Sequence, residues 1–241
     1  MIFNFINKIK NKNDNTGYRY ERKFAVSEIS VEGIESIIKN NEAFFKEIFY
    51  ERYVNNIYFD TQNLTFYNDN VSGKSQRKKY RIRWYGKLSG LIRNPVLEIK
   101  IKNGEAGTKK SYPLREFYFK DKINLKEISE TCFSASELPD EVREAVKNLF
   151  PVLINRYKRK YFLDFSGKYR ITLDSETEYF NISGGKAVLS NKATGEGYPI
   201  VELKYNIEDN KGASDISSLF PFRMTKNSKY VNGISVFYGA G

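Results

Sequence analysis

The chain has 241 residues, of which 40% are hydrophobic and 29% charged, and its 40 Lys and Arg against 29 Asp and Glu give a net charge of +11. This length suits one large domain or two small ones, and we expect one because single β-rich domains of this size are common. The positive charge favours anionic partners: nucleic acid, phosphorylated small molecules or an acidic membrane surface. The absence of histidine excludes Ser-His-Asp and Cys-His catalysis, His-ligated zinc and a phosphohistidine intermediate.

The first ten residues (MIFNFINKIK) are too few and too polar for a signal peptide or a membrane span. We interpret residues 1–17 as a polar, basic leader; a short amphipathic helix on a membrane surface is the alternative. No later apolar run is long enough for a spanning helix. The single cysteine, Cys132, excludes an intrachain disulfide and favours a reducing compartment. We therefore expect a soluble, cytoplasmic protein with its main domain over residues 18–241.

Most of the chain is predicted to form β-strands, because Tyr, Phe, Ile and Val crowd short runs between turn residues. The expected strands are Tyr18–Ser27, Asn55–Asp60, Lys79–Gly86, Pro95–Lys102, Lys109–Pro113, Arg156–Phe165, Tyr169–Asp174, Lys186–Leu189 and Ile200–Tyr205. The expected helices are Val31–Lys46, Pro139–Phe150 closed by Pro151, and a short one that begins at Ser214 and ends before Pro221. The expected class is α+β, with one dominant antiparallel sheet.

Charges recur on alternate residues in six of these stretches, with apolar side chains between them. The stretches are residues 21–23 (ERK), 81–83 (RIR), 98–102 (EIKIK), 159–161 (RKY), 170–174 (RITLD) and 202–204 (ELK). Successive side chains of a strand point to opposite faces, so each stretch gathers its charges on one side. For any single strand, a solvent-exposed face is the simpler interpretation. The nearly pure Lys, Arg and Glu content of the whole set instead predicts a closed sheet around a charged interior.

A basic interior of this kind suits a chain of phosphates. Arg can bind two phosphate oxygens at once through its planar guanidinium group, and Lys supplies a compact charge. The interspersed glutamates argue against a simple nucleic-acid groove, because carboxylates would repel the phosphate backbone. Inside a tunnel, glutamates can instead hold the divalent cations that accompany phosphates.

The order and spacing of these pieces resemble the VTC domain, the polyphosphate polymerase module of the vacuolar transporter chaperone complex. That domain belongs to the CYTH-like, triphosphate tunnel superfamily. The resemblance runs from Tyr18 to Gly233 and rests on ERKF (21–24), IYFDT (57–61), RIR (81–83), EIK (98–100), RKYF (159–162), RITLD (170–174), ELK (202–204) and KNSKY (226–230). It implies a closed antiparallel β-barrel, the triphosphate tunnel, with a few flanking helices.

The resemblance also implies roles for individual residues. The basic tunnel residues would be Lys23, Arg81, Arg83, Lys100, Lys109, Arg159 and Arg170, with Lys204 added by the alternating pattern. Lys226, Ser228 and Lys229 would contact phosphates near the end of the tunnel, and Glu202 would hold Mn²⁺ or Mg²⁺. Either Lys109 or its neighbour Lys110 could face inward, and Arg156 is expected outside.

Other polar residues are interpreted less specifically. Asp60 and Thr61 are interpreted as a strand-end turn or helix cap. The run Lys74, Arg77, Lys78 and Lys79 is interpreted as a solvated loop near a tunnel mouth. Cys132 is expected to be a passive, packed residue. The roles of Glu21, Glu98, Asp174 and Glu176 stay open.

The implied function is a polyphosphate polymerase that transfers the terminal phosphoryl group of ATP to inorganic polyphosphate, with a divalent metal. Three alternatives remain: a triphosphatase on the same tunnel, a non-catalytic polyphosphate binder, and a nucleic-acid binder. We expect ATP and polyphosphate as partners and no nucleic acid. Whether a membrane protein exports the product is left open.

Overall fold

The computed structural model describes residues 17–239, so the expected leader lies almost wholly outside the described residues. The strands are β1 (Arg19–Ala25), β2 (Lys46–Asp60), β3 (Gln76–Tyr85), β4 (Gly90–Ile92), β5 (Val96–Asn103), β6 (Ala106–Pro113), β7 (Phe117–Phe119), β8 (Phe150–Leu163), β9 (Arg170–Ser183), β10 (Lys186–Thr194) and β11 (Ile200–Asn206). The helices are α2 (Val31–Lys39), α3 (Thr65–Val71), α4 (Leu125–Ser134), α5 (Asp140–Lys147), α6 (Asn210–Ser218) and α7 (Lys229–Tyr238). None of these helices is long and apolar enough to cross a bilayer.

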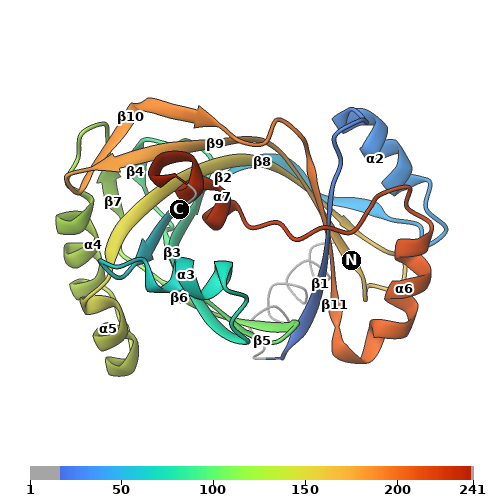
Figure 1. Ribbon diagram of the computed structural model, residues 1–241, viewed down its shortest axis with the longest axis horizontal. Helices are drawn as coiled ribbons and strands as arrows, with labels where there is room; N and C mark the ends of the chain where they lie inside the picture. Colours follow the sequence, from blue (N-terminus) through green and yellow to red (C-terminus); the bar gives the residue numbers. More distant parts are fainter. Residues whose placement is uncertain (1–16, 240–241) are drawn as a thin grey trace.

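The large sheet closes into a ring (Figure 1). Its strand order is β10-β9-β11-β1-β6-β5-β3-β2-β8, and β8 pairs back onto β9. Every pairing in the ring is antiparallel, although β1 and β6 share only the pair Arg19 and Gly107. Strand β10 continues beyond the ring on the edge of β9. The predicted α+β fold with a closed antiparallel sheet is confirmed.

The apolar core lies outside this ring rather than within it. Ile82 and Leu97 on β3 and β5 are fully buried in a cluster that includes Leu125 of α4 and Val142 of α5. A second cluster packs the apolar faces of β1, β9 and β11 against α2 and α6. Figure 1 shows α4 and α5 on one side of the ring and α2 and α6 on the opposite side. Because strand side chains alternate, the polar positions between these apolar ones face the interior of the ring.

Two expected helices are shorter than predicted, and only the last residue expected in each of them lies in a strand. The helix expected over Val31–Lys46 ends at Lys39, and β2 begins at Lys46 instead of Asn55. The first half of β2 was not predicted as a strand, because its pairing with β8 contains two register shifts and its exposed and buried positions do not alternate. The helix expected over Pro139–Phe150 ends at Lys147, and Pro151 lies in β8 beside a register shift, where a missing N–H is tolerated.

Several elements lay outside the predictions. Helices α3, α4 and α7 and the short strands β4 and β7 were not expected. Helix α6 begins at Asn210, four residues before the expected Ser214. Strands β9 and β10 extend well past Asp174 and Leu189, where the predicted strands ended.

Asp60 joins the barrel to the helices beside it. Its carboxylate accepts hydrogen bonds from the backbone N–H groups of Thr61, Phe66 and Tyr67 at 2.7–2.9 Å, and from the hydroxyl of Tyr230. Asp60 is completely buried. The side chain therefore caps α3 and ties α7 to the end of β2, as the helix-cap interpretation of Asp60 predicted.

We expect Asp60→Ala to lower the free energy of unfolding by about 2–4 kcal/mol, because three backbone donors and one hydroxyl would lose their buried acceptor. Urea denaturation followed by circular dichroism measures this change. Asp69→Ala is the control: Asp69 forms an ion pair with an exposed lysine, which contributes about 0–1 kcal/mol. Equal stabilities of the two variants would contradict the capping role.

Candidate functional site: a cationic bore

The interior of the ring is a cavity of about 450 Å³. Within the described residues, twelve basic side chains line it: Arg19, Lys23, Arg52, Lys79, Arg81, Arg83, Lys100, Lys109, Arg159, Arg170, Lys204 and Lys229. Only two carboxylates, Glu21 and Glu202, share this lining among residues 17–239. We call this cavity the bore.

Glu98 lies behind the lining and holds three cations together. Its carboxylate is 2.6 Å from Arg81 Nη2, 3.3 Å from Arg83 Nη1 and 2.6 Å from Lys109 Nζ. Burial alone would raise the pKa of Glu98, but the charges of Arg83 and Arg81 hold it well below its usual value. Glu98 is therefore an anion that fixes the position of three cations of the lining.

Glu202 on β11 is a second anion that holds cations of the lining. Lys23 Nζ lies 3.0 Å and Lys204 Nζ 2.6 Å from its oxygens, and Arg159 approaches to 3.6 Å. Lys204 and Lys23 hold the pKa of Glu202 well below its usual value, against the effect of burial. Burial lowers the pKa of Lys204 to about 8, although Glu202 opposes that shift.

Asp174 and Glu21 complete the set of interior carboxylates. Asp174 accepts two hydrogen bonds from Arg159, at 2.5 and 2.7 Å, and one from Lys229 at 2.5 Å. Glu21 accepts both its bonds from Lys100 Nζ, at 2.7 and 2.9 Å. Each carboxylate thereby orients its cation; the pairs of Asp174 are buried, whereas the pair of Glu21 with Lys100 is partly exposed.

Lys79 has no carboxylate partner among the ion pairs of the described residues. Its ammonium group donates to the hydroxyl of Ser228 at 2.7 Å and lies 5.8 Å from the ring centre of Tyr230. Burial, then the charges of Lys23 and other nearby cations, lowers the pKa of Lys79 well below its usual value. An anion bound beside it would remove this electrostatic penalty.

The structure brings nearly all the predicted site residues together. The bore is lined by Lys23, Arg81, Arg83, Lys100, Lys109, Arg159, Arg170, Lys204, Glu202, Ser228 and Lys229. Lys226 is the exception, since it is exposed and absent from the lining. Of the two adjacent lysines, Lys109 faces inward, whereas Lys110 approaches Glu141 at the surface.

Glu176 does not continue the inward register of Arg170 and Asp174. The pairing of β8 with β9 shifts between Arg156 and Lys158, and Glu176 has a left-handed φ of 49°. This bulge turns Glu176 outward, where it forms an exposed pair with Lys158 at 2.6 Å. Arg156 lies outside as expected, 3.5 Å from the ring centre of Tyr53.

Sequence reasoning missed three basic residues of the bore. Lys79 was assigned to a solvated loop, yet it lies in β3 two residues before Arg81, so the alternation could have identified it. Arg19 stands in the same alternation as Glu21 and Lys23. Arg52 gave no usable signal, because the first half of β2 was not predicted as a strand.

A divalent metal fits the bore only in company with phosphate. Among residues 17–239, no three carboxylate or thiol side chains form a group that could hold a metal. Mg²⁺ and related hard cations are commonly held by one or two carboxylates plus substrate phosphates. Glu202 and Glu21, the two carboxylates of the lining, meet this requirement.

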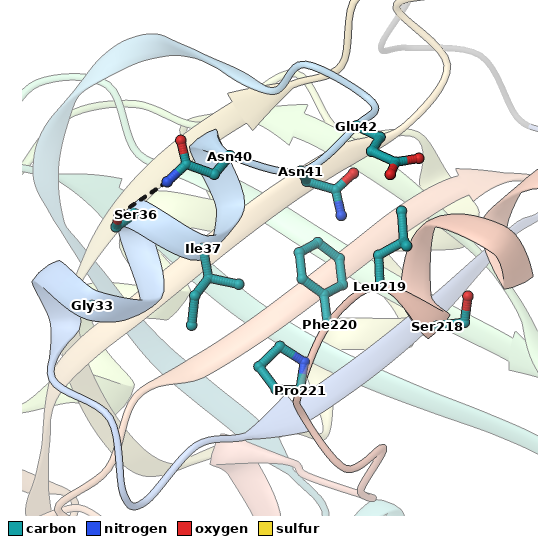
Figure 2. Close-up of a pocket in the computed structure, with 10 residues that line it drawn as sticks. All are labelled: Gly33, Ser36, Ile37, Asn40, Asn41, Glu42, Ser218, Leu219, Phe220 and Pro221. Carbon is teal, nitrogen blue, oxygen red and sulfur yellow. Dashed lines mark hydrogen bonds between the residues drawn. The ribbon is translucent and has the colours of Figure 1, made fainter.

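A larger hollow, of about 780 Å³, lies on the outer surface between α2 and the end of α6 (Figure 2). Ile37, Phe220 and Pro221 form much of its wall, and Glu42 is its one charged residue. This hollow lacks the cations that phosphate binding needs. The bore is therefore the candidate site for an anionic substrate.

The chain matches the family model of the VTC domain over residues 18–238. The structure therefore combines a closed antiparallel ring with a cationic bore, the architecture that the resemblance implied. Because the match covers nearly the whole chain, this protein belongs to the VTC domain family, as the sequence resemblance indicated.

Solved structures agree on the fold. A protein of Bacillus halodurans, described provisionally as an adenylate cyclase, is 15% identical with a TM-score of 0.52, over 92% of this chain and 98% of its own. A similarly described protein of Vibrio parahaemolyticus is 12% identical with a TM-score of 0.51, over 90% of this chain and 97% of its own. None of the curated proteins matches significantly.

We expect Glu98→Gln to lower the free energy of unfolding at pH 7 by about 3 kcal/mol, because three cations would lose their buried anion. The pKa of Glu98 is depressed in the folded state, so its contribution is complete above its unfolded pKa and is lost as the pH falls. The difference from wild type should therefore narrow below about pH 4.

Urea denaturation at several pH values, in buffer free of phosphate, measures this difference. Glu105→Gln, at an exposed position between β5 and β6, is the control and should leave stability within about 0.5 kcal/mol of wild type. A Glu98→Gln variant as stable as wild type at pH 7 would show that the carboxylate does not hold the cations.

Proposed function

We propose that this protein is a phosphotransferase that moves the terminal phosphoryl group of ATP onto inorganic polyphosphate inside the bore. One observation supports this most strongly: the large excess of basic side chains over carboxylates faces a single enclosed cavity. Such an arrangement is costly unless a multiply charged anion occupies it. Membership of the VTC domain family supports the same substrate class.

The bore suits a linear chain of phosphates. Strand β3 runs along the bore, with Lys79 near its start and Tyr85 at its end. Cations of the lining lie along the bore between these two residues. Arg81, Arg83 and Arg159 can each present two N–H donors to phosphate oxygens. Successive phosphates of a polymer would therefore find a cation at each level of the barrel.

Phosphoryl transfer between two phosphate chains needs no general base. A terminal oxygen of the acceptor chain attacks the γ-phosphorus, the bond from that phosphorus to the β–γ bridging oxygen breaks, and ADP leaves with that oxygen. The attacking oxygen is already an anion, so no proton has to be removed from it. Alignment of the two chains by Arg and Lys, and stabilisation of the charge on the transferred group, would supply the catalysis.

A divalent ion fits this scheme as a companion of the phosphates. Glu202, with Glu21 as a second carboxylate, would hold Mn²⁺ or Mg²⁺ at the bore. Bound there, the ion would neutralise phosphate charge during transfer. Because ATP is the proposed donor, we place the reaction in the cytoplasm.

Hydrolysis of triphosphate in the same bore is the second candidate. A triphosphatase needs a water positioned beside a metal, which a second carboxylate in the lining would favour. Glu21 faces the bore along with Glu202 and supports this alternative. Both carboxylates are already paired with lysines, Glu21 with Lys100 and Glu202 with Lys23 and Lys204, so a metal would have to displace an ammonium group from either one.

We expect the purified protein, supplied with ATP and Mn²⁺, to form long polyphosphate chains. One ADP should be released for each phosphate unit that is added to the polymer. Gel electrophoresis of the polymer and a coupled ADP assay measure the two products. Release of free phosphate without polymer would reject the polymerase and favour the triphosphatase.

The variant Glu202→Gln tests whether the protein is an enzyme or a non-catalytic polyphosphate binder. It keeps the size of the side chain but removes the charge that pairs with Lys23 and Lys204. An enzyme should lose at least tenfold in kcat while still binding tripolyphosphate, because the variant adds positive charge to the bore. A wild-type protein that binds tripolyphosphate tightly but turns over neither ATP nor tripolyphosphate would be a binder.

A further inference from the structure

One end of the bore differs chemically from the rest. Phe49, Tyr85 and Tyr161 surround Arg52 there, and all four residues line the cavity. Tyr85 ends β3, whereas Phe49 and Arg52 lie in the first half of β2. Antiparallel pairing sets Val54 opposite Tyr85 and Phe49 opposite Tyr161, so these side chains share one end of the barrel. We call this group the aromatic mouth.

Arg52 lies against three aromatic rings. Its guanidinium carbon is 4.2 Å from the ring centre of Tyr85, 4.8 Å from that of Tyr161 and 5.2 Å from that of Phe49. Its Nε is buried and has no hydrogen-bond partner among the described residues. No carboxylate forms an ion pair with Arg52 within residues 17–239. The aromatic mouth thus combines flat faces with one cation that no carboxylate of the described chain holds.

Aromatic rings are poor ligands for phosphate, and the lysines and arginines deeper in the bore already supply the groups that bind it. Aromatic faces and guanidinium planes do bind other flat π-systems, nucleobases above all. Tyr85 is also accessible, with 47% of its surface exposed, whereas Tyr58 and Tyr230 near the opposite end are 4% and 2% exposed. Those two are buried against each other with their rings stacked, 5.1 Å apart.

We infer that the aromatic mouth binds the base of the donor nucleotide, stacked on Tyr85 and Arg52, with the triphosphate directed into the bore. This inference rests on the proposed function, since it requires a nucleoside triphosphate as donor. It also sets a direction: the nucleoside occupies the end of Tyr85, and the polyphosphate extends toward Lys79 and Ser228. Any difference in affinity between ATP and inorganic tripolyphosphate then depends on the aromatic mouth alone.

The test compares ATP with inorganic tripolyphosphate, because both carry three phosphates and only ATP carries a base. Calorimetric titration in the presence of EDTA measures both affinities without turnover. In Tyr85→Ala, the Kd for ATP should rise at least about fivefold, equivalent to about 1 kcal/mol. The Kd for tripolyphosphate should stay within twofold. Tyr85→Trp, which keeps an aromatic face, should restore ATP binding.

Tyr50→Ala is the matched control, since Tyr50 lies next to Phe49 but is 95% exposed and absent from the lining. It should leave both affinities unchanged. The inference is overturned if Tyr85→Ala weakens the two ligands equally, if it leaves ATP binding unchanged, or if the wild type does not bind ATP. Tyr85→Ala could weaken the binding of ATP but not of tripolyphosphate, while the wild type makes no polymer. That combination would support the base site and reject the polymerase.

Discussion

Repulsion among the cations of the bore is the constraint to which the rest of the structure responds. Four carboxylates form ion pairs with these cations and reduce the repulsion between them: Glu21, Glu98, Asp174 and Glu202. These four carboxylates cannot balance the twelve cations of the lining. The pKa values of Lys79 and Lys204 are lowered by burial, and neighbouring cations add to the effect. The folded protein therefore holds a positive potential that a polyanion would relieve.

This arrangement reverses the usual plan of a small barrel. The apolar faces of the strands point outward, and two sets of helices cover them: α4 and α5 on one side, α2 and α6 on the other. The helices therefore supply the hydrophobic core that the interior cannot. Asp60 fixes two further helices, α3 and α7, to the end of β2. The apolar contacts that stabilise the fold therefore lie outside the ring, and the interior is free to bind a substrate.

The alternation of charged and apolar residues was enough to predict the closed sheet and most of the bore. It correctly placed Arg81, Arg83 and Lys204 on the inner face, because regular strands obey a period of two. The period of two fails where the backbone departs from it, as at the bulge that turns Glu176 outward, and the role of this residue could not be assigned from the sequence. Arg52 was missed because its strand was assigned partly to a helix and partly to no element.

Tertiary contacts explain the remaining differences. The link from Asp60 to α7 is made by Tyr230, 170 residues away, which no local pattern reveals. The partners of Asp174 come from β8 and α7, so its structural role required the folded chain. Lys226 was expected at the bore by resemblance, but in the irregular segment before α7 Lys226 is exposed, whereas Ser228 and Lys229 line the bore.

A crystal structure of the protein with bound tripolyphosphate tests most directly whether the bore is an anion site. We expect the three phosphates inside the barrel, with oxygens within about 3 Å of the guanidinium groups of Arg81 and Arg83. The ion pairs of these residues with Glu98 should persist. Tripolyphosphate bound only on the outer surface, with an empty bore, would contradict the proposal that these buried charges exist to hold phosphate.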